Sequence, residues 1–86
     1  YRSLNNELRK LDNHIQKVDM LIHAKESEIG ALEEWFANPA QFQDAALIDS
    51  KSGIYATLKQ EEGNLWESWE NLSREIDLIR EKLEEF

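Results

Sequence analysis

Between residues 4 and 22 the chain reads LNNELRKLDNHIQKVDMLI, with an aliphatic side chain at alternating steps of four and three residues. Such steps repeat every seven residues, so these side chains form one stripe along a supercoiling helix. The stripe comprises Leu4, Leu8, Leu11, Ile15, Val18 and Ile22, and it resumes after Lys25 with Ile29, Leu32 and Phe36. The sequence therefore predicts a long first helix over about residues 3–37.

A second stripe with the same spacing occupies the other half of the chain. It comprises Tyr55, Leu58, Leu65, Trp69, Leu72, Ile76, Ile79, Leu83 and Phe86, with Glu62 as its one polar gap. This stripe predicts a second helix over about residues 51–86. Two such helices in a chain of 86 residues predict one domain with an all-α fold, a two-helix antiparallel coiled-coil hairpin.

The tip of this hairpin is expected at residues 38–50, which mix turn, cap and apolar residues. Asn38 and Pro39 should end the first helix and begin a short capped turn, because proline disfavours the helical conformation at the residue before it. The second helix should begin between residues 44 and 52, with Asp49 or Ser50 as the best caps. Phe42 is expected to fold back onto the end of the core.

The register of the two stripes can also be predicted. If heptad positions a and d alternate along both helices, Ile22 lies opposite Leu65 and Lys25 lies opposite Glu62. The only two charged residues of the stripes then share one layer. Because an unpaired charge in such a place costs more than a paired one, we expect a Lys25–Glu62 ion pair.

Charge is unevenly distributed along the chain, which carries ten basic and eighteen acidic residues and a net charge of −8. Residues 21–70 hold three lysines against ten carboxylates, so the tip half is acidic. Contact with nucleic acid, which depends on neutralising phosphates, is therefore expected only at the open end of the hairpin. The candidate residues there are Arg2, Arg9, Lys10, Lys17, Arg74, Arg80 and Lys82.

No pattern in the sequence indicates an enzyme. His14 and His23 are nine residues apart and do not share a helix face, and adjacent pairs such as Glu33–Glu34 point in different directions. We therefore expect no catalytic residues, no metal, no cofactor in this segment and no small-molecule substrate. Cysteine is absent, and neither a membrane span nor a signal peptide is recognisable, so a cytoplasmic protein without membrane contact is expected.

Several large apolar residues fall outside or at the margin of the stripes. Trp35 and Ile54 are expected to meet across the hairpin near its tip. Met20, Leu21, Trp66 and Leu78 either pack on the flanks of the hairpin or form a surface for a partner.

Two segments resemble a known family. LEEWFANPAQFQD at residues 32–44 resembles the hairpin tip of the C-terminal coiled-coil domain of ABC-F ATPases of the Uup type, and LWESWENL at residues 65–72 resembles that domain's returning helix. The resemblance implies a non-catalytic arm of a cytoplasmic ATPase that contacts DNA, RNA, the ribosome or the parent's own ATPase domains. ATP and magnesium would bind to that parent, outside this segment. Asn38 and Phe42 also resemble the tip of the tRNA-contacting hairpin of valyl-tRNA synthetases.

The alternative to such an arm is a structural module without nucleic-acid binding. A hairpin of this kind would serve protein–protein interaction or dimerisation, and its apolar residues outside the core would contact another helix.

Overall fold

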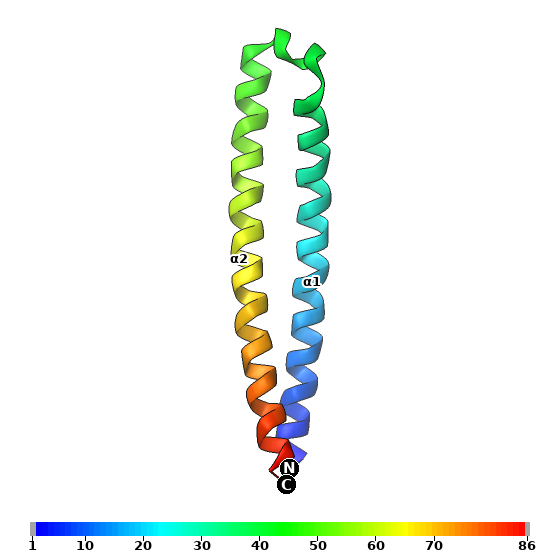
Figure 1. Ribbon diagram of the computed structural model, residues 1–86, viewed down its shortest axis with the longest axis vertical. Helices are drawn as coiled ribbons and strands as arrows, with labels where there is room; N and C mark the ends of the chain where they lie inside the picture. The colour runs from blue at the N-terminus through cyan, green and yellow to red at the C-terminus, as the bar shows by residue number, and fades with distance from the viewer. Residues whose placement is uncertain (1, 86) are drawn as a thin grey trace.

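The computed structural model describes residues 2–85 as two long antiparallel helices joined by a short tip (Figure 1). Helix α1 spans Arg2–Ala37, the 3-10 helix η1 spans Pro39–Gln43, and helix α2 spans Ala45–Glu84. The rod measures 65 × 14 × 14 Å, and the first and last described residues lie together at its open end (Figure 1). The predicted all-α hairpin is confirmed, while Phe86, expected as the last member of the second stripe, lies outside the described residues.

The two stripes form a core that is one side chain thick. Among residues 2–85, eight of their side chains are buried, and Ile22, at 1% exposure, is the most buried of them. Six of these eight form two clusters, while Ile76 and Ile79 are buried nearer the open end. One contains Val18, Ile22 and Leu72 with Leu11, Ile15, Leu65 and Trp69, and the other contains Ile29, Leu32 and Leu58 with Phe36 and Tyr55. Each cluster joins residues that the predicted register places opposite one another. The interval between the clusters is the level of Lys25 and Glu62.

The second helix begins within the predicted range of residues 44–52, but before the two preferred caps, Asp49 and Ser50. Asp44 is its N-cap, with a side-chain oxygen that accepts a hydrogen bond from the backbone N–H of Leu47 at 3.1 Å. Residues 45–50, expected in the tip, are helical, so Asp49 and Ser50 are not caps. The reason is local: Asp44 is a strong cap residue and is followed directly by alanines and a leucine, which favour a helix. The non-α-helical tip is therefore limited to residues 38–44.

The tip itself confirms the predicted capped turn. Asn38 accepts a hydrogen bond from the backbone N–H of Ala40 at 3.1 Å, and Pro39 occupies the first position of η1. Phe42 does not fold back onto the core; it is 58% exposed. Because Phe42 lies outside the core, the core ends near the tip at Phe36 and its edge-on aromatic contacts.

Aromatic rings close the core near the tip. The ring of Phe36 packs edge-on against Trp35 at 5.1 Å and against Tyr55 at 6.1 Å between centroids. The Lys51 ammonium lies 5.7 Å from the Trp35 ring centroid, a cation–π arrangement. Trp35 thus packs on Phe36 and Lys51, whereas Ile54, its expected neighbour, remains 47% exposed.

Gly63 provides a test of the helical account. It lies in the interior of α2, and a Cβ added there would have no other atom within 4 Å. Because alanine loses less backbone freedom than glycine on folding, Gly63→Ala should stabilise the hairpin by about 1 kcal/mol, measured by urea denaturation. Ala31→Gly, at an exposed position of α1, is the matched control and should lose a similar amount. A destabilised Gly63→Ala variant would contradict the description of α2.

Candidate interaction surfaces

The two sides of the rod present different residues. In a heptad, position e borders the core position a, and position g borders the core position d. In an antiparallel hairpin the g positions of both helices meet on one side, and the e positions meet on the other. The g side carries Leu21, Glu28 and Trp35 of α1 with Ile54 and Glu61 of α2; the e side carries Asp19 and Glu26 of α1 with Lys59 and Trp66 of α2.

The charged layer in the core is paired differently from the prediction. Lys25 Nζ lies 2.5 Å from Glu61 Oε2 and 4.0 Å from Glu28 Oε2. Glu62, whose side chain is only 17% exposed, instead pairs with Lys59 at 3.4 Å. The expected Lys25–Glu62 ion pair is therefore wrong in its partner, although both residues do lie at the level between the two core clusters.

The heptad positions explain this pairing. Lys25 occupies a d position, so its long side chain carries the ammonium outward to the g side, where Glu61 and Glu28 lie. Glu62 occupies an a position, and its carboxylate extends to the e side, where Lys59 lies one turn earlier on the same helix. The two charges of one layer thus extend to opposite sides of the rod. Each meets a counter-charge at the margin of the core, where water still reaches the pair.

Lys25 also neutralises a repulsive arrangement. Glu28 and Glu61 face each other across the g side, and the ammonium lies between them. The hydrogen bond to Glu61 raises the pKa of Lys25 above its usual 10.5, partial burial opposes the shift, and the charges of Glu61 and Glu28 add to it. The stability contributed by this pair is therefore fully present below pH 10.5 and is lost as the pH rises through the folded-state pKa.

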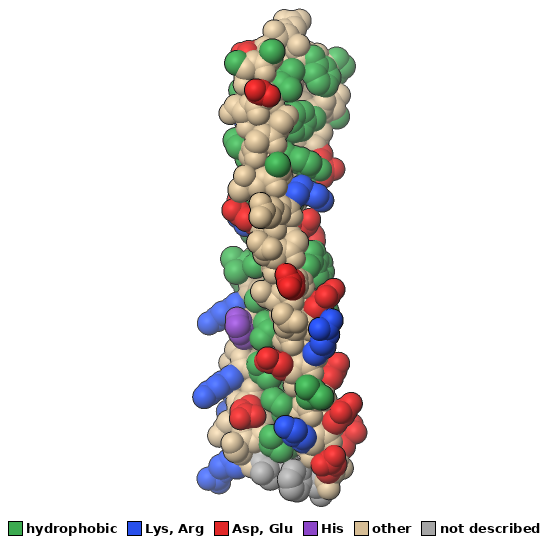
Figure 2. Space-filling model, turned by 90° about the vertical axis from the view of Figure 1, so that its left-hand side faces the viewer, with side chains coloured by type: hydrophobic (Ala, Val, Ile, Leu, Met, Phe, Trp, Pro, Cys, Tyr) green, Lys and Arg blue, Asp and Glu red, His purple; other side chains and the backbone are tan. Residues whose placement is uncertain are grey.

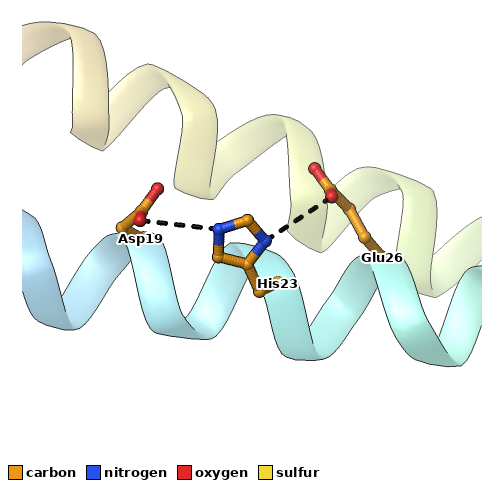
Figure 3. A network of polar contacts seen from close by, with 3 residues as sticks. All are labelled: Asp19, His23 and Glu26. Atoms are coloured by element: carbon orange, nitrogen blue, oxygen red, sulfur yellow. Dashed lines mark ion pairs between the residues drawn. The ribbon is translucent and has the colours of Figure 1, made fainter.

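A second polar network lies on the outer face of α1, toward the e side (Figure 3). His23 Nε2 lies 3.5 Å from Asp19 Oδ2, and His23 Nδ1 lies 3.9 Å from Glu26 Oε2. Each ring nitrogen faces a carboxylate at the distance of a weak ion pair. This network was not predicted, because His23 was compared only with His14. The spacing of i, i+4 and i, i+3 to acidic residues was the available signal.

Among residues 2–85, no group of three or more histidine, aspartate or glutamate side chains is arranged to hold a metal ion. The Asp19–His23–Glu26 network is instead a set of exposed, weak ion pairs, which form fully only when His23 is protonated. Neither described helix contains a segment long and apolar enough to cross a bilayer.

The seven basic candidates for nucleic-acid contact are all exposed, but the structure does not bring them onto one face. Arg2 and Arg9 line one shallow groove together with Asp12. Lys10 and Lys82 line a second groove with Glu7 and Glu75. The remaining three, Lys17, Arg74 and Arg80, line neither groove. In the lower, open-end half of the rod, blue and red side chains alternate across the surface (Figure 2). Acidic neighbours therefore weaken the positive potential that phosphates would meet.

The four candidate partner residues are exposed on different faces. Leu21, at 52% exposure, and Leu78, at 57%, both lie toward the g side, since Leu78 occupies position c next to g. Met20 lies on the face of α1 opposite the core, and Trp66 lies on the e side. The Trp66 ring packs edge-on against Trp69 with 5.7 Å between centroids, so part of it belongs to the flank of the core. These four residues do not form one continuous surface.

No protein-family model matches this chain, and neither a curated protein nor a solved structure matches it significantly.

The pairing of Lys25 can be tested by comparing two double-mutant cycles. In the first, Lys25→Gln and Glu61→Gln are measured singly and together by urea denaturation, and their effects should be non-additive because the side chains interact. In the second, Lys25→Gln and Glu62→Gln should be close to additive, since Glu62 pairs with Lys59. Coupling in the second cycle and additivity in the first would contradict the pairing and restore the cross-core ion pair.

Proposed function

We propose that the chain is a non-catalytic coiled-coil arm in the cytoplasm that makes contacts for a larger protein. The resemblance to ABC-F ATPases of the Uup type favours the C-terminal arm of such an ATPase. Its contacts would be with DNA, RNA, the ribosome or the parent's own ATPase domains. ATP and magnesium would act in the parent and not in this segment.

The observation that supports this proposal is the shape of the hairpin, a long rod whose apolar stripes are buried between its two helices. The apolar stripes are consumed in holding α1 against α2, and what remains is a 65 Å rod with charged and apolar side chains along its sides. A rod of this kind offers surfaces at defined distances from its open end. It suits a spacer or contact arm better than a substrate-binding protein, which needs a concave pocket.

For nucleic acid, the proposed contact is the open end of the rod. All seven basic candidates are exposed there, whereas the tip half carries an excess of acid. Lys10 and Lys17 are one heptad apart on α1, so they lie on the same face, about 10 Å apart at 1.5 Å per residue. The two ammonium groups can therefore contact the same stretch of phosphates, so this pair is the first to test.

Binding to duplex DNA and to a structured RNA should be followed by fluorescence anisotropy between about 50 and 200 mM salt. The double variant Lys10→Gln with Lys17→Gln should weaken binding and reduce the slope of log K against log salt by about 0.9 per lost contact to B-DNA. Lys59→Gln, which removes one exposed positive charge from the tip half, should leave binding unchanged. Absence of binding at the lowest salt would exclude nucleic acid as a partner of this arm.

A protein contact is the second candidate, and the exposure of Leu21 and Leu78 favours it. Both side chains are more than half exposed and lie toward one side of the rod, where a further helix would bury them.

A further inference from the structure

Three exposed apolar side chains recur at even spacing toward the g side of the rod. Leu78 lies near the open end, Leu21 near the middle and Ile54 near the tip, with exposures of 57%, 52% and 47%. In the observed register Leu78 is about twelve residues of helix below Leu21, and Ile54 is about twelve above it. At 1.5 Å per residue, neighbouring apolar side chains are therefore roughly 18 Å apart along the rod.

Each of the three is the exposed part of a shallow groove that reaches the core. The core residues that complete these grooves are Leu65 beside Leu21, Leu11 and Ile79 beside Leu78, and Leu58 beside Ile54. The grooves therefore offer apolar surface on both sides of the middle of the rod at matching distances.

A surface with this symmetry is complementary to itself. Dimers with a two-fold axis use the same patch on both copies, so each residue of the patch must meet a suitable residue of the other copy. A two-fold axis that passes beside Leu21, perpendicular to the rod, brings Leu21 of one copy against Leu21 of the second copy. The same rotation brings Ile54 of each copy against Leu78 of the other.

We propose that the g side is a homodimer interface, in which a second copy of this chain packs antiparallel to the first with Leu21 at the two-fold axis. The assembly is a four-helix bundle in which α1 faces α1 and α2 faces α2. The dimer goes beyond the contacts proposed for the open end, and its existence does not depend on whether those contacts include nucleic acid.

Charge favours the antiparallel over the parallel orientation of the second copy. The tip half of each rod has ten carboxylates and three lysines, so a parallel dimer would place two strongly acidic halves side by side. In the antiparallel dimer each acidic half lies beside the nearly balanced open-end half of the other copy. Asp49 in the Ile54 groove then lies near Lys82 in the Leu78 groove of the second copy.

The size of the face is adequate for a stable dimer. One side of a rod 65 Å long and 14 Å wide is on the order of 900 Å² per copy, against about 800 Å² per partner in an interface of standard size. Ala24 and Ala31, at c positions of α1 next to the g side, leave room for the backbones to approach.

Sedimentation equilibrium of the 86-residue chain tests the dimer. Over about 1–200 μM chain, the mass should rise toward twice the 10.1 kDa of one copy. Leu21→Glu should weaken dimerisation by about 100-fold or more, because it places two carboxylates at the two-fold axis and acts in both copies. Met20→Glu adds the same charge at the neighbouring residue, which is 71% exposed on the face opposite the core, and should leave the dimer intact. Circular dichroism should show unchanged helix in both variants, since neither residue is in the core.

Cysteine cross-linking tests the orientation, since the chain has no cysteine of its own. Under oxidation Leu21→Cys should form a covalent dimer by itself. Ile54→Cys and Leu78→Cys should each remain uncross-linked alone and should form a covalent heterodimer when mixed. A chain that stays monomeric at 200 μM, a dimer that survives Leu21→Glu, a dimer lost in Met20→Glu, or cross-linking of Ile54→Cys with itself would each overturn the proposal.

Discussion

The hairpin depends on the mutual burial of two apolar stripes in a core that is one side chain thick. In the part of the chain that the structure describes, each helix buries its stripe against the other, and most helical stability comes from such packing. Every layer of the core therefore contributes to holding the whole rod together. Into this core the sequence places one charged layer, Lys25 with Glu62, and the core divides into two clusters at that level.

The charged layer is accommodated by the direction in which each side chain leaves the core. Lys25 extends to the g side and meets Glu61, while Glu62 extends to the e side and meets Lys59. Each charge keeps contact with water and gains a counter-charge, which avoids the desolvation that a fully buried ion pair would suffer. The same layer opposes slippage, because a shift of one heptad would place Lys25 and Glu62 in separate layers, each against an apolar partner.

The two sides of the rod, defined by heptad positions e and g, carry different residues. On the e side of α1, Asp19 and Glu26 flank His23 in a polar network. The g side instead has Leu21, Ile54 and the Lys25–Glu61 contact. Apolar residues outside the core lie on several faces, since Met20 is opposite the core and Trp66 is on the e side. Leu21, Ile54 and Leu78 face one direction, which is the physical basis for inferring a second copy there.

Much of the fold could be predicted from the sequence because heptad spacing reports directly on burial. The two stripes predicted both helices, their antiparallel arrangement and the layer that Lys25 shares with Glu62. The start of α2 lies within the predicted range, but the preferred caps were wrong, because Asp44, Asp49 and Ser50 are all acceptable caps and spacing does not choose among them. The partner of Lys25 was missed because the heptad register gives only the height of each Cα atom along the rod. The long lysine side chain carries its ammonium away from that position, to the g side, where Glu61 lies. The exposed position of Phe42 depends on the path of η1, which no periodic pattern encodes.

The central claim is that the charged layer holds the two stripes in one register. Side-chain nuclear Overhauser effects in a uniformly carbon-13- and nitrogen-15-labelled sample of the chain measure that register directly. The account predicts contacts between Ile22 and Leu65 and between Ile29 and Leu58, with the Lys25 ε-protons close to the Glu61 γ-protons. Contacts between Ile29 and Leu65, which lie one heptad out of this register, would contradict it.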